Sequence, residues 1–171
     1  MFNFLKKEKP IEILSPMTGK IISLEKVDDK EFPDKRLGDG VAIEITDGKV
    51  IAPFDGEITS SYRSNHCLTI TSEDGIELLI HIGLDTIKLK GEGFTQHVSL
   101  MDKVNKGDVI LEADLELLKE KGKSLVSPVM ITNMGRVETL EKLEGDVEKG
   151  KSNIMTVLLK KSKYDKRRRK K

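Results

Sequence analysis

The chain has 171 residues, of which 35% are charged and only 4% are aromatic, and its formal net charge is +1. This length predicts one domain with a core of Ile, Leu and Val, and no apolar run is long enough to cross a bilayer. The single cysteine, Cys67, excludes an intramolecular disulfide and, with no signal-peptide pattern at the start, favours a cytoplasmic location.

Positive charge is concentrated at the C-terminal end of the chain. Lys160–Lys171 holds nine Lys or Arg residues and one acidic residue, so the rest of the chain has 21 basic and 28 acidic residues. An acidic body disfavours nucleic acid and favours a basic protein partner. We therefore expect no nucleic-acid partner and a basic, disordered tail over residues 160–171.

The N-terminal residues 1–10, M-F-N-F-L-K-K-E-K-P, predict a flexible arm. Phe2, Phe4 and Leu5 beside two lysines suit at most a weak contact with a membrane interface, because the segment is short. Between the arm and the tail, residues 11–159 are expected to form the folded domain.

Short segments rich in β-branched residues and separated by Gly, Pro and Asp follow one another from Ile11 onward. Many short strands with few helical patterns predict an all-β fold, an antiparallel sandwich or barrel. The helical candidates are Gln96–Leu100 and Leu115–Lys121. The expected strands are Ile13-Leu14, Gly19–Ser23, Val41–Thr46, Val50-Ile51, Gly56–Ser60, Leu68–Thr71, Leu78–Ile82, Val109–Glu112, Val129–Thr132 and Asn153–Leu159.

Two sequence patterns occur twice, which predicts a duplicated β-motif whose sheets face each other. P-x-x-G-x-I occurs at Pro16–Ile21 and at Pro53–Ile58, and V-x-x-G occurs at Val104–Gly107 and at Val147–Gly150.

Two of the three histidines lie in a predicted β-hairpin, Ser64–Asp85, around the turn signal S-E-D-G. A four-residue loop would place His66 opposite His81, and a two-residue loop would place the two residues diagonally. Both registers put the imidazoles on one face, within roughly 4.5–8 Å of each other. A three-residue loop would put them on opposite faces and would remove the site.

Zinc and a swinging-arm carrier are two chemistries that this region does not favour. Cys67 alternates to the opposite face from His66, and Asp85 approaches His81 only after a bend, so a third zinc ligand is missing. Val104–Asp114 resembles half of a biotinyl or lipoyl domain but lacks the acceptor lysine at its tip.

Phosphoryl transfer needs fewer groups. An imidazole nitrogen is nucleophilic at neutral pH, and a second imidazole nearby can stabilise the phosphoryl oxygens during transfer. The hydroxyl of Ser64, two residues before His66, is a candidate for fixing the tautomer of that histidine.

The sequence resembles enzyme IIA of the glucose family, the phosphocarrier of the bacterial phosphoenolpyruvate-dependent sugar phosphotransferase system, from about Ile13 to Leu158. The matching segments are S-P-M-T-G-K-I-I-S-L from Ser15, L-G-D-G-V-A-I from Leu37, A-P-F-D-G-E-I from Ala52, S-N-H from Ser64, L-I-H-I-G-L-D-T from Leu79, L-K-G-E-G-F from Leu89 and P-V-M-I-T-N-M from Pro128.

This resemblance implies an antiparallel β-sandwich in which His81 is phosphorylated through Nε2 and His66 steadies the phosphoryl group. It implies that the Gly83 carbonyl accepts a hydrogen bond from Nδ1 of His81. Ser64 stands where the family usually has Thr, and it keeps the hydroxyl. His97 matches no motif position and is expected at the surface.

The resemblance also implies a docking surface, an apolar ring with aspartates that receives the basic carrier HPr and then the IIB domain of a sugar permease. Leu79 and Tyr62 stand where Phe is common, and Arg36 stands where an apolar residue is common, so the partner preference is open. The residues at the docking positions are Asp29, Phe32, Leu37, Tyr62, Leu79 and Asp85.

No cofactor is expected. In some members of the family the two histidines share an intermolecular zinc with a regulatory target, which would here involve His66 and His81. Two alternatives stay open at this point: a regulatory binding module controlled by phosphorylation, and a zinc-dependent hydrolase.

Overall fold

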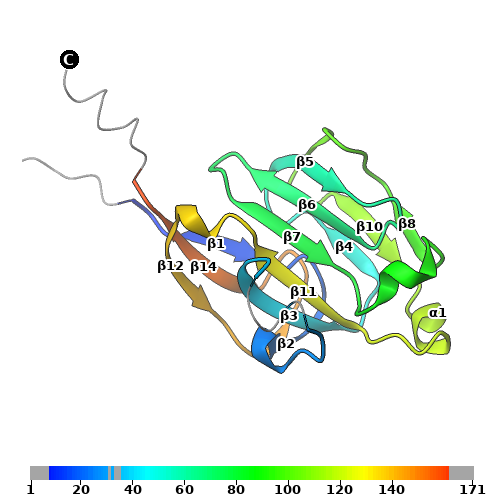
Figure 1. The fold of residues 1–171 in the computed structure, drawn as a ribbon. Coiled ribbons are helices and arrows are strands. Elements are labelled where there is room, and N and C mark those ends of the chain that lie inside the picture. Colours follow the sequence, from blue (N-terminus) through cyan, green and yellow to red (C-terminus); the bar gives the residue numbers. More distant parts are fainter. Residues whose placement is uncertain (1–7, 31, 33–35, 162–171) are drawn as a thin grey trace, which may run out of the picture.

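The structure is a computed structural model that describes residues 8–30, 32 and 36–161 (Figure 1). The expected N-terminal arm, with Phe2, Phe4 and Leu5, lies outside the described residues apart from positions 8–10. The basic tail lies outside them too, apart from Lys160 and Lys161. In the described part of the chain, no helix is long and apolar enough to cross a membrane.

Short strands are the main regular secondary structure of the described chain, with one short α-helix, α1 (Leu115–Glu120), and three 3-10 helices, η1 (Leu24–Lys26), η2 (Thr86–Leu89) and η3 (Met134–Arg136). The strands are β1 (Ile11–Leu14), β2 (Gly19–Ser23), β3 (Asp39–Ile45), β4 (Lys49–Ile51), β5 (Gly56–Ser61), β6 (Cys67–Ser72), β7 (Glu77–His81), β8 (Phe94–Gln96), β9 (Lys103–Val104), β10 (Val109–Ala113), β11 (Val126–Ile131), β12 (Val137–Lys142), β13 (Asp146–Val147) and β14 (Asn153–Leu159).

The strands form one large sheet and two small ones. The large sheet has the order β13-β2-β3-β11-β7-β6-β5-β9, and the small sheets have the orders β1-β14-β12 and β4-β10-β8. Figure 1 shows β12 and β14 at the left of the molecule and β5–β8 with β10 at the right. Every strand pair is antiparallel. The predicted antiparallel all-β fold is therefore confirmed.

The core is aliphatic, as the composition predicts. Alternate residues of the strands face inward, so that Leu68 and Ile70 of β6 and Leu78 and Ile80 of β7 are at most 1% exposed. These residues belong to one large cluster of buried Ile, Leu and Val side chains contributed by the large sheet and both small sheets. Burial of this aliphatic face fixes the positions of β6, next to which His66 lies, and of β7, at whose end His81 lies.

The predicted duplication appears in the strand pairing. Gly19 of β2 pairs with Val147 of β13, and Gly56 of β5 pairs with Val104 of β9. These are the glycines and valines of the two repeated patterns. A Cβ at Gly19 or Gly56 would lie 2.1 or 2.4 Å from a backbone oxygen of the next strand, so both strands require glycine there.

Equivalent positions follow from the same pairing. Gly19 pairs with Ile45 of β3, and Gly56 pairs with Ser72 of β6. Gly40 stands five residues before Ile45, and Cys67 stands five residues before Ser72. On the next strand, Gly40 pairs with Met130 of β11, and Cys67 pairs with His81 of β7. Met130 and His81 therefore occupy equivalent positions in the two halves of the sheet.

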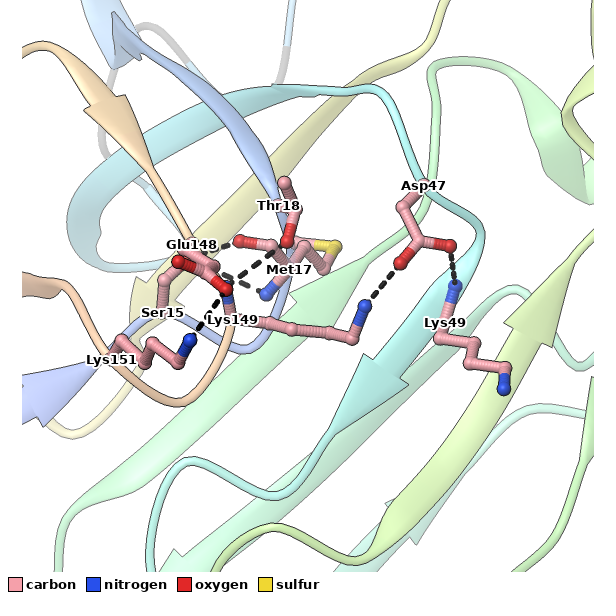
Figure 2. Close-up of polar contacts among 8 residues, drawn as sticks. All are labelled: Ser15, Met17, Thr18, Asp47, Lys49, Glu148, Lys149 and Lys151. Carbon is pink, nitrogen blue, oxygen red and sulfur yellow. Dashed lines mark hydrogen bonds and ion pairs between the residues drawn. The ribbon is translucent and has the colours of Figure 1, made fainter.

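A polar cluster joins the segment before β2 to the loop between β13 and β14 (Figure 2). The Thr18 hydroxyl accepts a hydrogen bond from the backbone N–H of Lys149 at 3.1 Å, and the ammonium of Lys149 pairs with Asp47. The pKa of Asp47 lies below its ordinary value, chiefly because of this contact with Lys149. Buried Ser15 donates its hydroxyl hydrogen to the Met17 carbonyl, so this cluster fixes the turn before β2.

The secondary-structure predictions were wrong at two kinds of place. Gln96–Leu100 was expected to be helical, but Gln96 ends β8 and the Asp102 carboxylate accepts the N–H of Ser99 in a turn at 2.8 Å. The strands β8, β9, β12 and β13 were not expected. They are short or, like β12, mostly exposed and charged, so their sequences lack a strong β signal. The helix expected at Leu115–Lys121 is confirmed as α1.

Candidate functional site

The two hairpin histidines meet at one end of β6 and β7. Their ring centroids are 4.8 Å apart with an interplanar angle of 82°, an edge-to-face arrangement. His81 is the last residue of β7, and His66 stands one residue before β6 begins. The predicted proximity of the two imidazoles is confirmed.

The register that brings them together is not the predicted one. Thr71 pairs with Glu77 and the N–H of Ser72 donates to the Ile76 carbonyl at 2.9 Å, so the loop has three residues, 73–75. A three-residue loop was expected to separate the histidines, and that expectation is wrong. Strand alternation does not apply to His66, which lies outside β6.

The backbone before His66 explains the difference. Asn65 adopts a left-handed φ of 55°, a conformation that Asn accepts more readily than most residues, so the chain turns immediately before the histidine. Asp85 and Lys90, at the two ends of η2, also have left-handed φ values of 60° and 52°. Such backbone strain often occurs at functional sites.

His81 is held through one nitrogen. Its Nδ1–H donates to the Gly83 carbonyl at 2.8 Å, since a carbonyl only accepts, and the neutral ring therefore has an unprotonated Nε2. The N–H of Gly83 donates in turn to the buried hydroxyl of Ser127 at 3.0 Å. Gly83 has a φ of 71°, and a Cβ there would lie 2.7 Å from the Ser124 carbonyl oxygen, so only glycine fits.

His66 is held in a different way. It is 3% exposed, and its Nδ1 lies 2.6 Å from the hydroxyl of Ser64. The rings of Tyr62 and Phe94 lie 5.9 and 6.3 Å from it, centroid to centroid. The short path from Ser64 to His66 gives the hydroxyl a direct hold on the imidazole, as the sequence predicted.

Both imidazoles are neutral at pH 7. Burial, and next the neighbouring ring of His81, lower the pKa of His66 from 6.5 to about 4, against a backbone hydrogen bond at Ser64. Burial also lowers the pKa of His81, while its bond to Gly83 and the charge of Asp29 act in the opposite direction. Neutral His81 is the form in which Nε2 is a nucleophile.

The apolar ring expected around the histidines is only partly exposed. Phe32 stacks edge-on against His81, with centroids 5.2 Å apart, but it is itself 3% exposed, and Leu79 is 8% exposed. Leu37 and Tyr62 are exposed, at 42% and 49%, and so is Ile87 at 55%, which the sequence analysis did not identify. Of the four apolar residues expected in the ring, only Leu37 and Tyr62 are therefore exposed.

The two expected aspartates differ. Asp29 is half-buried and close enough to His81 to influence its pKa. Asp85 is exposed and already forms ion pairs with Lys88 at 2.9 Å and Lys123 at 3.4 Å, which hold the pKa of its carboxyl below the usual range. Asp85 was expected at a docking position for a basic partner, and the pairing with these two lysines was not expected.

Metal ligands do not converge on the site. Among residues 8–30, 32 and 36–161, no group of three or more His, Cys, Asp and Glu side chains is placed to hold a metal ion. Cys67 is buried, and burial raises the pKa of its thiol to about 12, which disfavours the thiolate that zinc binds. His97 is exposed as predicted, and its Nε2 lies 2.9 Å from the Glu112 carboxylate.

Three supporting residues were missed by the sequence analysis. Ser127 holds the peptide of Gly83, the buried hydroxyl of Thr86 donates to the Ile82 carbonyl at 2.6 Å, and Phe94 packs near His66. Thr86 and Phe94 lie within matching segments that were recognised, and Ser127 immediately precedes another. The segments carried the signal, but only the structure relates these side chains to the histidines.

Comparison with known proteins places this geometry in context. Residues 11–137 match the family model described as phosphoenolpyruvate-dependent sugar phosphotransferase system, EIIA 1. A glucose-specific EIIA component of that system from Bacillus anthracis is 40% identical over 161 residues, which cover 94% of this chain and 98% of the relative. The corresponding protein from Haemophilus influenzae is 38% identical over 151 residues, with coverage of 88% and 91%.

A solved structure is similar as well. The glucose permease IIA from Mycoplasma capricolum superimposes with a TM-score of 0.81 at 34% sequence identity, covering 91% of this chain and 99% of that protein.

Proposed function

Because this chain belongs to the EIIA 1 family of the phosphoenolpyruvate-dependent sugar phosphotransferase system, we propose that His81 is the residue that carries its phosphoryl group. Membership makes the chain a phosphocarrier in sugar uptake, a phosphotransferase, and the alternatives of a zinc hydrolase and a regulatory module have no support. The observation behind the choice of His81 is its bond from Nδ1 to Gly83, which leaves Nε2 as the reactive nitrogen.

Nε2 of His81 takes part in both the acceptance and the donation of the phosphoryl group. The lone pair of Nε2 attacks the phosphorus of the donor's phosphohistidine, a new N–P bond forms, and the donor's N–P bond breaks with its electron pair returning to the donor imidazole. The ring of His81 then carries positive charge, which the Gly83 carbonyl stabilises through Nδ1–H. A cysteine thiolate of the acceptor next attacks phosphorus, and the electron pair of the N–P bond returns to Nε2.

His66 stabilises the phosphoryl oxygens in this proposal. When the Ser64 hydroxyl donates to Nδ1 of His66, the one proton of the neutral ring sits on Nε2, where it serves as a donor. The pKa of about 4 supports this role, since a neutral ring keeps the same tautomer throughout the physiological range.

The partners follow from the family. EIIA proteins of this system work between HPr and IIB domains in general, and we propose that HPr donates to His81 and a sugar-permease IIB domain accepts, in the cytoplasm. The relatives carry glucose in their names, so the IIB domain of a glucose permease is the first acceptor to test. Residues 11–159, from the start of β1 to the end of β14, form the proposed phosphocarrier domain. Regulatory targets stay a prediction.

Phosphorylation by enzyme I, HPr and phosphoenolpyruvate tests the proposal. The intact protein should gain the mass of one phosphoryl group, and His81→Ala should gain none. His66→Ala should still accept the group. His97→Ala is the matched control, because the third histidine is exposed and pairs with Glu112. Retention of the mass shift in His81→Ala would overturn the assignment.

A further inference from the structure

Two hydroxyl groups hold the peptide group that joins Ile82 to Gly83, directly after His81. The Thr86 hydroxyl donates to its carbonyl at 2.6 Å, and its N–H donates to the Ser127 hydroxyl at 3.0 Å. This peptide group is therefore held at both ends by side chains, one from η2 and one from β11.

The direction of both hydrogen bonds is fixed. Thr86 and Ser127 are fully buried, so water does not compete for their hydroxyls. The Ser127 hydroxyl donates its own hydrogen to the Leu125 carbonyl at 3.0 Å, which leaves a lone pair for the N–H of Gly83. The Thr86 hydroxyl must donate, because the Ile82 carbonyl only accepts. The two side chains therefore orient this peptide group in one direction.

The next peptide group, between Gly83 and Leu84, is the one that contacts the histidine. Its carbonyl accepts the Nδ1–H of His81 at 2.8 Å, and its N–H donates to the Ser124 carbonyl at 3.3 Å. Hydrogen bonds in such a chain polarise one another, so the contact with Ser124 makes the carbonyl a stronger acceptor. The tautomer of His81 thus depends on where this carbonyl points.

Glycine alone does not keep the carbonyl in place. Gly83 has a φ of 71°, a conformation that suits glycine, but glycine also adopts many others at little cost. If one hydroxyl is removed, a buried polar group of the preceding peptide loses its partner, and a rotation of that peptide relieves the penalty. The rotation moves the Gly83 carbonyl away from Nδ1 of His81, after which the neutral ring can hold its proton on either nitrogen.

We propose that Ser127 and Thr86 are positioning residues for phosphoryl transfer, because their hydroxyls keep the proton of His81 on Nδ1. They act through the backbone of Gly83 and do not touch the imidazole. The inference rests on the proposed function, which makes Nε2 of His81 the reacting nitrogen. A ring with its proton on Nε2 has no lone pair there and cannot attack phosphorus. Each hydroxyl therefore raises the fraction of His81 that is ready to accept the group.

Removal of either hydroxyl tests the proposal. NMR of the unphosphorylated protein with ¹⁵N-labelled histidine at pH 8 reports which nitrogen of His81 carries the proton. The wild type should show the proton on Nδ1, and Ser127→Ala and Thr86→Val should each show a mixture of tautomers. Acceptance from phospho-HPr should slow by about tenfold in both variants, as for loss of a group that orients a reactive ligand.

Two controls separate orientation from stability. Thr86→Ser keeps the hydroxyl and loses only a methyl group, so it should keep the wild-type tautomer of His81. Ser15→Ala removes another fully buried serine hydroxyl, which donates to the Met17 carbonyl in the cluster before β2. It should lower the stability as Ser127→Ala does, without changing the tautomer of His81.

The outcomes distinguish this proposal from the proposed function. A wild-type tautomer of His81 in either folded variant overturns the proposal, and Thr86→Val decides alone if Ser127→Ala does not fold. The same mixture of tautomers in Thr86→Ser or Ser15→Ala also overturns it, since the effect would then be a general loosening. These results leave the proposed function standing, because the tautomer is measured without phosphorylation. A wild-type protein that is phosphorylated at a residue other than His81 overturns the proposed function itself.

Discussion

The two halves of the large sheet repeat one pairing pattern, yet only one of them holds the two histidines that we propose act in phosphoryl transfer. Met130 on β11 and His81 on β7 occupy equivalent positions, opposite Gly40 and Cys67. Met130 is fully buried in a small cluster with Leu24, Val27, Phe32, Ala42 and Leu84, to which η1 contributes. His81 is partly exposed and faces His66 instead.

The comparison shows that the strand framework does not itself create the site. The same sheet position holds a core methionine where a loop covers it and a histidine where the cover is incomplete. In the half with the histidines, the turn at Asn65 and the carbonyl of Gly83 fix the two rings. Four predictions test this comparison of the two halves.

Among the variants that should still accept a phosphoryl group, His66→Ala should have the largest effect on onward transfer. His66→Ala keeps the Nδ1 bond of His81 and should still accept a phosphoryl group, but its onward transfer to IIB should slow by about 10²–10³-fold, as for loss of one stabilising donor. Single-turnover transfer from the isolated phosphoprotein measures this rate. An unchanged rate would show that His66 is only a packing residue, and failure to accept the group would reverse the roles of the two histidines.

Exchange of the equivalent residues comes next. Met130→His places an imidazole in an apolar cluster without a partner, and the free energy of unfolding should fall by about 3 kcal/mol. His81→Met at the open position should change it by less than about 1 kcal/mol, although it abolishes phosphorylation. Urea denaturation compares the two. Equal losses of stability would mean that the positions of Met130 and His81 are equally shielded from water, against the comparison made above.

Acidification should lower the free energy of unfolding because of the buried His66. Unfolded His66 binds a proton below about pH 6.5, whereas the folded residue does so only near pH 4. The unfolded state therefore binds more protons in this window, and the free energy of unfolding falls as the pH falls.

The contribution of His66 between pH 7 and pH 5 is about 2 kcal/mol, and the loss is complete below about pH 4. Denaturation at a series of pH values measures it. His66→Gln should flatten the profile over this range, and a profile that the substitution leaves unchanged would contradict the lowered pKa.

Loss of the Ser64 hydroxyl should have the smallest effect. In Ser64→Ala the buried ring of His66 loses its Nδ1 partner, and onward transfer should slow by about tenfold because the two tautomers become closer in energy. Ser64→Thr restores a hydroxyl and should restore the rate. If Thr fails to rescue the rate, the effect of Ala is one of packing.

Much of the fold could be predicted because aliphatic strands have a strong pattern. Gly19–Ser23 and Asn153–Leu159 have the bounds that the sequence predicted, since turn residues mark their ends. β12, V-E-T-L-E-K, was missed because it is an edge strand with four of its six residues exposed, so its sequence resembles a polar segment. Edge strands depend on pairing with a neighbour more than on their own composition.

The site was predicted at the level of residues and not of geometry. The motifs identified His66, His81, Ser64 and Gly83, and the bonds expected of the last two are present. The hairpin register failed because alternation presumes a regular strand, and a single left-handed residue at Asn65 breaks that rule. The ion pair of Asp85 with Lys123 was not predicted for a different reason, because Lys123 lies 38 positions away in sequence.

The central claim is that Nε2 of His81 carries the phosphoryl group. NMR of the phosphorylated protein with ¹⁵N-labelled histidine tests it directly, because the ³¹P–¹⁵N coupling identifies the bonded nitrogen. The account predicts coupling to Nε2 of His81, with Nδ1 still protonated and bonded to the Gly83 carbonyl. Coupling to Nδ1 of His81, or to either nitrogen of His66, would contradict it.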